Sequence, residues 1–429
     1  MNRHATCLAL ALSLCAAEAA AQSASLEGAV YAMSNRPEGN SIAAWGRAED
    51  GTLSPIGEFA TGGLGASFDG GEGLDPLISA YALTLTQDER FLLAVNAGSN
   101  TVSAFEIQDD YSLVLTGLAR SSGVGPNSIA EHEGLIYVSN IDADGVFNGE
   151  PDQEGSLGVM RLTPTGALET TPLGMRLLRN RPSAVQFSTD GQHVVVASIN
   201  AGSNALASGS EDELVVYRVM PSGLLSERPV GRGSSTFPFN AANRNLPSAI
   251  GFQIVEQAGA QFVVVTEARE FQADGSPPAF DALQTGSVST FRLEPSGQLT
   301  PIALDVIAGD TILDGERTAC WLDFGPEGDV FFVSNALEST LSSYSFDQGT
   351  IELIRSIEAS GFGPMTGDPF GTSDGFIDLW VSRDGRFLYQ LYGLSGTVGV
   401  FEVDGHELTL IQEVEDFLPD TNTQGIVAL

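Results

Sequence analysis

The chain has 429 residues, of which 42% are hydrophobic and 17% are charged, and it contains 49 glycines and 20 prolines. So many glycines and prolines exclude a helical bundle or a coiled coil, and the apolar content excludes a disordered chain. With 19 basic and 55 acidic residues the formal net charge is -36, which repels nucleic acid and anionic lipid. The sequence has no lysine, so Schiff-base and P-loop mechanisms are excluded as well.

The first 21 residues are predicted to form a secretory signal peptide. An arginine and a histidine precede an apolar run, and the small residues Ala19–Ala21 supply a cleavage site. The apolar run is too short to span a bilayer. Only Cys320 lies beyond this segment, so the mature chain has no partner for an intramolecular disulfide. We therefore expect a periplasmic or secreted protein in which residues 22–429 form a single domain.

Two short patterns alternate along the chain. One is a turn followed by an apolar strand, and it begins at Gly51, Gly166, Gly223, Gly297, Gly349 and Gly405, with a degenerate copy at Asp110. The other is a strand rich in Val, Phe and Tyr, and it ends at Asn35, Asn96, Asn140, Asn200, Glu267, Asn335 and Tyr392. A further strand, expected to begin after Pro76, Pro126, Pro182, Pro247 and Arg317, precedes this one through a tight turn. Each unit thus contains four antiparallel strands, a to d.

About seven such units predict an all-β fold, a seven-bladed β-propeller of four-stranded antiparallel blades. The mature chain enters the first blade in strand b, near Val30, and a spare strand, Gly425–Leu429, remains at the C-terminus. We expect this spare strand to complete the first blade and close the ring. Two or three unrelated β-sandwiches are the alternative, but these would not keep one order of strands throughout.

Long loops are predicted on one face of the propeller. They are Gly62–Gly73, Asp142–Ser156, Ala201–Glu213, Gly231–Asn245, Ala268–Gly286 and Ser360–Gly375. Each connects strands b and c of one blade or links one blade to the next, and these connections share a face. Long loops on one face of a rigid scaffold typically carry binding and catalysis. We therefore predict a site at the mouth of the central channel on this face.

Polar residues at the strand ends on this face are the candidates for the site. Two arginines can hold a carboxylate or an oxyanion, and a carboxylate removed from water can move a proton. The predicted catalytic residues are Glu267, Arg181 and Arg317. The predicted substrate-binding residues are Asp75, Asn127, Asn96, Asn140, Asn200, Asn335, Asp378 and Gln424. Asparagines at strand ends also form turns, and the arginines could instead pair with loop carboxylates between blades.

No metal or cofactor is expected. His132, His193 and His406 fall on the opposite face, so neither a histidine base nor a histidine-rich metal site is expected at the mouth. The acidic segment from Asp142 to Glu154 could bind a divalent cation, but it lacks EF-hand spacing and is more typical of a solvated loop. Cys320 is expected to be a small buried residue.

Several stretches resemble the seven-bladed propeller lactonase family, which includes 6-phosphogluconolactonase and fungal carboxymuconate-lactonising enzymes. The stretches are Leu74–Leu77, Leu92–Phe105, Arg181–Gly191, Val265–Glu267, Ile377–Tyr389 and Thr423–Ala428. The resemblance implies hydrolysis or formation of a sugar lactone by Arg, Glu and His at the mouth. By position, Arg181, Glu267 and Arg317 match that set. The family's Pro-Arg-His start of an inner strand is replaced by Arg181-Pro-Ser183, without the histidine.

We therefore expect an exported lactonase-like enzyme, either a carboxylic ester hydrolase or a lactonising cyclase. It would act as a monomer on a small sugar- or carboxylate-derived lactone, without nucleic acid or membrane partners. The alternative is a non-enzymatic propeller that binds a partner or glycan through its loop-rich face. A mouth plugged by the loops Gly231–Asn245 or Ser360–Gly375 would favour this alternative, and an open mouth with converging Arg and Glu would favour the enzyme.

Overall fold

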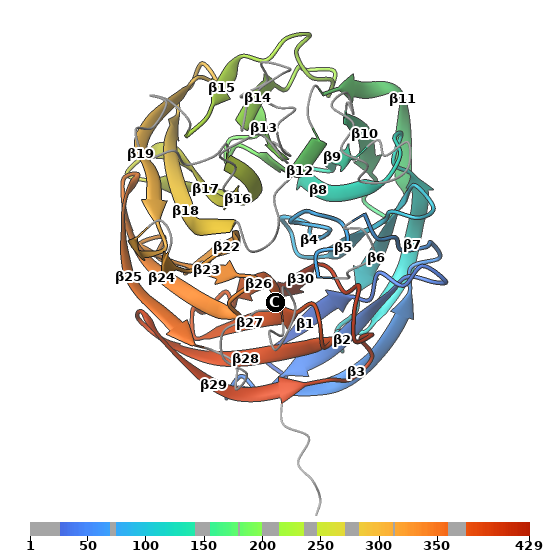
Figure 1. Cartoon of the computed structure of the whole chain (residues 1–429). Coiled ribbons are helices and arrows are strands. Elements are labelled where there is room, and N and C mark those ends of the chain that lie inside the picture. The colour runs from blue at the N-terminus through green and yellow to red at the C-terminus, as the bar shows by residue number, and fades with distance from the viewer. Residues whose placement is uncertain are drawn as a thin grey trace, which may run out of the picture.

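The computed structural model describes residues 26–68, 74–141, 155–178, 181–199, 214–235, 247–270, 283–311, 314–358 and 375–429. Within these residues the secondary structure consists of β-strands arranged as a ring of small antiparallel sheets (Figure 1). In the same part of the chain, no helix is long and apolar enough to cross a membrane.

The first three blades are regular. The first contains β1 (Gly28–Met33), β2 (Ser41–Arg47), β3 (Leu53–Ala60) and β30 (Ile426–Ala428). The second contains β4 (Leu83–Leu85), β5 (Phe91–Asn96), β6 (Thr101–Ile107) and β7 (Leu113–Arg120). The third contains β8 (Pro126–His132), β9 (Leu135–Asn140), β10 (Ser156–Leu162) and β11 (Leu168–Leu177).

The next two blades share one eight-stranded sheet. The fourth contains β12 (Arg181–Phe187), β13 (His193–Ile199), β14 (Leu214–Arg218) and β15 (Gly231–Gly233). The fifth contains β16 (Pro247–Gln257), β17 (Ala260–Glu270), β18 (Leu283–Leu293) and β19 (Leu299–Ile307). A single residue pair, Ile199 with Ser248, joins them, so the sheet separates into two four-stranded blades.

A short hairpin of β20 (Gly309–Thr311) and β21 (Asp314–Gly315) precedes the last two blades. The sixth contains β22 (Ala319–Phe324), β23 (Val330–Asn335), β24 (Thr340–Asp347) and β25 (Thr350–Glu358). The seventh contains β26 (Phe376–Val381), β27 (Phe387–Tyr392), β28 (Thr397–Asp404) and β29 (Glu407–Val414). The predicted all-β, seven-bladed fold is confirmed.

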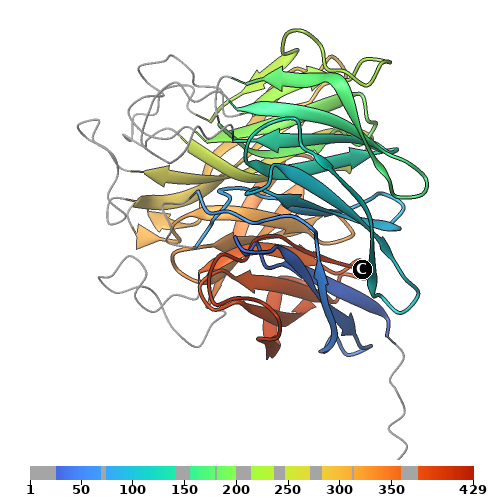
Figure 2. The ribbon, with the colours of Figure 1, turned by 90° about the vertical axis from the view of Figure 1, so that its right-hand side faces the viewer.

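The C-terminal strand closes the ring as predicted. β30 pairs with β1 in the antiparallel register Val30–Ala428, Tyr31–Val427 and Ala32–Ile426. The main chain extends this closure, because the Met33 amide donates to the Gly425 carbonyl over 3.1 Å. Figure 2 shows the ring from the side, with the C-terminus at the end of this strand.

Burial follows the position of each strand in its blade. Strands next to the innermost one, such as β1, β5 and β27, are buried along their whole length. In outer strands such as β3 and β7 only the first residue is buried, and the others are half-buried or exposed. This pattern is expected when both faces of the middle strands are covered by neighbouring blades while the rim faces water.

Polar side chains on three inner strands link neighbouring blades. Each accepts a hydrogen bond from a backbone amide of the next blade: Gln186 from Ile254 (3.3 Å), Gln253 from Phe324 (3.1 Å) and Asp323 from Val381 (2.7 Å). Asp323 is buried and the two glutamines are half-buried, so these contacts satisfy polar groups that have little access to water and hold the blades in register around the ring.

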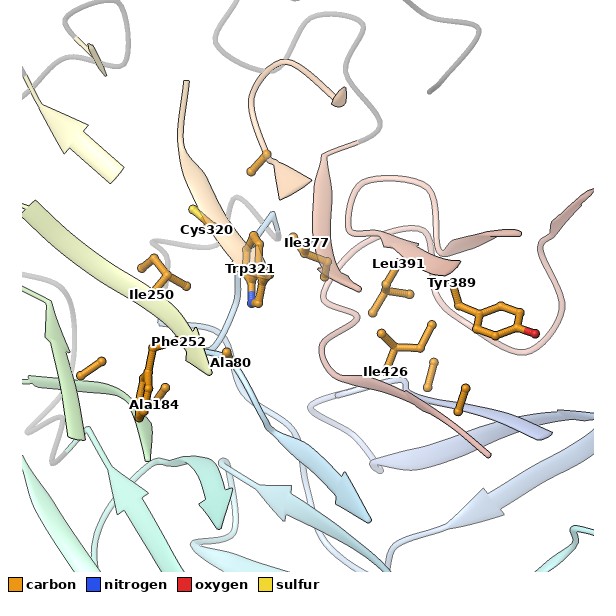
Figure 3. Packing of buried hydrophobic residues seen from close by; sticks show 14 of the residues in the cluster. Ala80, Ala184, Ile250, Phe252, Cys320, Trp321, Ile377, Tyr389, Leu391 and Ile426 are labelled. Carbon is orange, nitrogen blue, oxygen red and sulfur yellow. The ribbon is translucent and has the colours of Figure 1, made fainter. Parts of the chain in front are cut away.

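The axis of the ring is occupied by residues 74–82, which we call the axial segment. Its hydrogen bonds reach most of the other blades: Ser79 Oγ to the Asn127 carbonyl (2.8 Å), the Ala80 amide to the Ser183 carbonyl (3.1 Å), Tyr81 Oη to the Phe252 carbonyl (2.6 Å), and Trp321 Nε1 and Gln424 Nε2 to the Ser79 carbonyl (2.9 Å each). Figure 3 shows Ala80 in the same hydrophobic cluster as Phe252 and Trp321.

The axial segment corrects the prediction that an inner strand begins after Pro76. β4 begins only at Leu83, and Asp75 therefore does not stand at the start of a strand. Ile78 and Tyr81 have φ values of 50° and 63°, which are incompatible with an extended strand. Hydrogen bonds of Ser79 and Tyr81 with several blades stabilise this non-strand conformation across the axis.

Two predicted loop boundaries also change. Gly231–Gly233, assigned above to a loop, is β15, and the strand predicted after Gly223 is reduced to a bridge between Val219 and Leu225. Pro229 lies between the turn at Gly223 and β15. Because it has no amide hydrogen to donate to β14, the outer strand of this blade begins only after it. The loop Ala268–Gly286 is shorter than predicted, because β17 and β18 remain paired up to Glu270 and Leu283.

Candidate active site

Glu267 lies near the end of β17 and is fully buried. Its register partners are Ala249 on β16 and Ser287 on β18, and the Ser287 hydroxyl donates a hydrogen bond of 2.5 Å to Glu267 Oε2. A buried carboxylate held by a hydroxyl has a defined orientation and little contact with solvent. This arrangement suits a group that exchanges a proton with a bound water or substrate.

Irregularities in the sheet surround Glu267. The β16–β17 register shifts between Ala249 and Phe252, and the β17–β18 register shifts between Glu267 and Arg269. β-Bulges bend a strand and re-aim side chains, and they are over-represented near active sites. The register therefore shifts on both sides of β17 close to this carboxylate, and the pairing continues beyond each shift.

Arg317 is brought to the same part of β18 by the β20–β21 hairpin. The Gly286 amide donates to the Glu316 carbonyl over 2.8 Å, and Arg317 forms an isolated bridge with Thr285. Thr285 lies two residues from Ser287, the partner of Glu267, so both candidates adjoin one short stretch of β18. Glu267 and Arg317 therefore both lie beside residues 285–287 of β18, Glu267 through its pairing with Ser287 and Arg317 through its bridge with Thr285.

The charge of Arg317 is balanced within blade six. Its Nε donates to Glu338, in the turn between β23 and β24, and the two form an ion pair. Their side chains are 27% and 12% exposed, respectively, so the pair is only partly screened by water. Arg317 therefore pairs with a loop carboxylate, as the alternative from the sequence proposed, although that carboxylate belongs to its own blade.

Arg181 begins β12 and lies on the same side of the ring as Glu267. A continuous row of paired residues leads from blade four to blade five: Arg181 with Ile199, Ile199 with Ser248, and Ser248 with Ala268. Burial lowers the pKa of the Arg181 guanidinium from its ordinary value, but arginine remains a cation in proteins. A half-buried guanidinium acts on an anion more strongly than an exposed one.

Asn96 and Asn335 have structural partners. Each is fully buried, and each donates from Nδ2 to two hydroxyls of the neighbouring strand. The acceptors of Asn96 are Thr101 and Ser103 (3.2 and 2.8 Å), and those of Asn335 are Thr340 and Ser342 (3.1 and 2.9 Å). These bonds satisfy the Nδ2 groups of both asparagines without a substrate.

The other candidate asparagines differ in what the structure describes. Asn127 donates to the Pro182 carbonyl over 2.8 Å and accepts from Ser139 over 2.7 Å, so it links blades three and four. Asn140 is fully buried and donates to the Val138 carbonyl over 3.1 Å. Asn200 lies outside the described residues.

Asp378 and Gln424 meet at the axial segment. Gln424 Nε2 donates to Asp378 Oδ2 over 2.9 Å, and the Gly425 amide donates to the same oxygen over 2.8 Å. Burial raises the pKa of Asp378 to about 7, despite these donors. Asp75 caps the Ser79 amide over 3.2 Å. These residues fix the axial segment to the ring closure.

Two residues that the sequence analysis did not select join this group. Burial raises the pKa of Asp323 to about 7, and burial, followed by the charges of Asp323 and Asp378, raises the pKa of Tyr81 far above its ordinary value. Asp323 occupies the inner-strand position that Gln186 and Gln253 occupy in blades four and five. That repeated polar residue in an otherwise apolar strand was the signal that could have identified it.

The described residues contain no group of three or more His, Cys, Asp or Glu side chains that could hold a metal ion. The acidic segment from Asp142 to Glu154 lies outside these residues. Cys320 is buried, and burial, followed by the nearby charge of Asp75, raises the pKa of its thiol far above the ordinary value. A thiol in that state is a poor nucleophile.

Part of the chain is similar to a known protein family. Residues 269–417 match the model of the family described as Lactonase, 7-bladed beta-propeller. The resemblance to propeller lactonases is confirmed. The match includes Arg317 and blades six and seven, and it supports a lactone-hydrolysing enzyme. No curated protein matches the chain by sequence.

Several solved structures have a fold similar to that of this chain over almost its whole length. A periplasmic gluconolactonase from Pseudomonas aeruginosa superposes with a TM-score of 0.63 at 16% identity, covering 94% of this chain and 99% of that one. A putative 6-phosphogluconolactonase from Bacteroides fragilis gives 0.59 at 17% identity, covering 94% and 98%. A hypothetical selenium-binding protein from Sulfolobus tokodaii gives 0.58 at 11% identity, covering 94% and 93%. At these identities the likeness concerns the fold alone.

Proposed function

We propose that the chain is an exported enzyme that hydrolyses a small sugar- or carboxylate-derived lactone on the loop-bearing face of the ring. The observation that carries the proposal is the fully buried Glu267, which bonds to Ser287 and adjoins the stretch of β18 that meets Arg317. A carboxylate replaces an asparagine of the repeat at this point, within a fold for which the family match supports lactone hydrolysis.

In the proposed reaction Glu267 accepts a proton from a water molecule, whose oxygen attacks the lactone carbonyl. The carbonyl oxygen becomes an oxyanion, and Arg181 stabilises it by charge and hydrogen bonding. When the tetrahedral intermediate collapses, the bond to the ring oxygen breaks and Glu267 returns its proton to that oxygen. The product is an open-chain hydroxy acid, released as its carboxylate.

The charges favour an uncharged lactone over a phosphorylated one. Glu338 already balances Arg317, and the chain as a whole carries a formal net charge of -36. A dianionic substrate would be repelled at long range by this net charge. The periplasmic location of one structural neighbour agrees with export, which the predicted signal peptide suggests. Cleavage after residue 21, seen by mass spectrometry of the protein recovered from the periplasm or medium, would support this part of the proposal.

The test is hydrolysis of a lactone panel by the wild type and by Glu267→Gln. The amide keeps the size of the side chain but cannot accept a proton, so kcat should fall by about 10²- to 10⁴-fold. Glu49→Gln, at an exposed position, is the matched control and should retain full activity. Equal rates for Glu267→Gln and the wild type, or no hydrolysis by the wild type, would refute the proposal and favour a binding scaffold.

A further inference from the structure

Ser287 is the residue that faces Glu267 across the β17–β18 pair. Both side chains are fully buried, so bulk water does not compete for the hydrogen bond between them. An ionised carboxylate can only accept hydrogen bonds, which makes the serine hydroxyl the donor. The bond therefore stabilises the charged form of Glu267 relative to the neutral form.

The same two positions recur in other blades with different chemistry. In blade two Asn96 is the register partner of Thr101, and in blade six Asn335 is the register partner of Thr340. In those blades the amide is the donor and the hydroxyl is the acceptor. In blade five the direction is reversed, because the carboxylate has no hydrogen to donate. The hydroxyl thus belongs to the repeat, but only in blade five does it act on a charge.

The second hydroxyl of the repeat has another use in blade five. Ser103 and Ser342 accept from the asparagine amides of blades two and six. The corresponding residue, Ser289, instead accepts from the Asp305 amide over 2.9 Å on the outer strand. The register between β18 and β19 shifts directly beside it, between Val288 and Thr290. Ser287 is therefore the repeat hydroxyl that remains at the carboxylate.

We propose that Ser287 is a positioning residue for Glu267: its hydroxyl fixes the plane of the carboxylate and keeps it ionised at the pH where it must accept a proton. This inference rests on the proposed function of Glu267 as the base. It assigns no contact between Ser287 and the substrate. The expected effect is therefore on kcat and on the pH profile rather than on KM.

The test compares Ser287→Ala with Ser287→Thr. Alanine removes the donor, whereas threonine keeps it and is the residue found at this position in blades two and six. A hydrogen bond to a charged group corresponds to about one to two pKa units. We expect the acidic limb of the kcat/KM profile to move up by about one to two pH units in Ser287→Ala, with kcat lowered about tenfold or more near that limb and KM unchanged. Ser287→Thr should restore both values.

A second measurement separates failure of this inference from failure of the proposed function. The protonation of Glu267 is followed by difference infrared spectroscopy, with Glu267→Gln identifying its carboxyl band. If that titration is the same in the wild type and Ser287→Ala, the inference is overturned whatever the activity. If the titration shifts but the wild type hydrolyses no lactone, the proposed function fails and the positioning role fails with it. A shift together with the predicted pH profile supports both.

Discussion

The buried carboxylate of Asp378 makes a quantitative prediction about stability. Burial raises its pKa from 3.8 to about 7 in the folded chain. Between these values the folded protein keeps a proton that the unfolded protein releases. The stabilisation is therefore complete below pH 3.8 and is lost as the pH rises through 7. Since one pKa unit corresponds to about 1.4 kcal/mol, the loss due to Asp378 should be about 4 kcal/mol by pH 9.

Asp378→Asn isolates this effect. Both hydrogen bonds to the side chain are accepted by Oδ2, so the asparagine carbonyl can take them and its amide can stand where the acid hydroxyl would be. The free energy of unfolding is measured by urea denaturation from pH 4.5 to pH 9. The variant should lose about 3 kcal/mol less than the wild type over this range, because about 1 kcal/mol of the total is already lost by pH 4.5. Tyr81 and Asp323 remain in both proteins.

Asp416→Asn is the matched control, because it removes the same formal charge from an exposed position. General repulsion among the many acidic residues also lowers stability as the pH rises, and the control measures that contribution. The reasoning would be refuted if Asp378→Asn lost stability with pH as steeply as the wild type, or if the control became as flat as Asp378→Asn.

Two further predictions concern packing. A Cβ at Gly286 would lie 2.6 Å from the Ala319 amide nitrogen, so Gly286→Ala should lower the free energy of unfolding by about 1–3 kcal/mol. Gly39→Ala is the control, because no atom lies within 4 Å of its Cβ, and it should not lower the stability. Equal midpoints of urea denaturation for the two variants would contradict this prediction. Val427 in β30 is fully buried, so Val427→Asp should cost more than about 4 kcal/mol and open the ring, while Val124→Asp, at a position 42% exposed, should cost little. Native-like thermal melting of Val427→Asp would show that β30 does not carry the closure.

The repeat pattern was sufficient to predict the fold, because the order of the strands and the glycines in their turns are local features of the sequence that recur in about seven units. It could not predict the axial segment, since Leu74–Leu77 has the composition of a strand and only contacts with distant blades decide otherwise. The position of β15 was predicted wrongly for a similar reason. Pro229 cannot donate a hydrogen bond to the neighbouring strand, and this matters only once β14 is known to be that neighbour. Two strand ends, Glu267 and Tyr392, depart from the repeated asparagine, and of these Glu267 was predicted to be catalytic, but its partner was not predicted. Ser287 is an ordinary residue of the repeat whose importance arises from the carboxylate opposite.

The axial segment limits the routes by which a substrate can reach the site and a product can leave it. Its backbone and side chains bond to blades on several sides of the axis, so the middle of the ring is filled by protein. A substrate that binds at the junction of blades five and six would therefore have no route along the axis to the opposite face of the ring. Hydrolysed product would have to depart through the same opening by which the next molecule arrives. Accumulated hydroxy acid should then act as a competitive inhibitor, raising the apparent KM without changing the maximal rate.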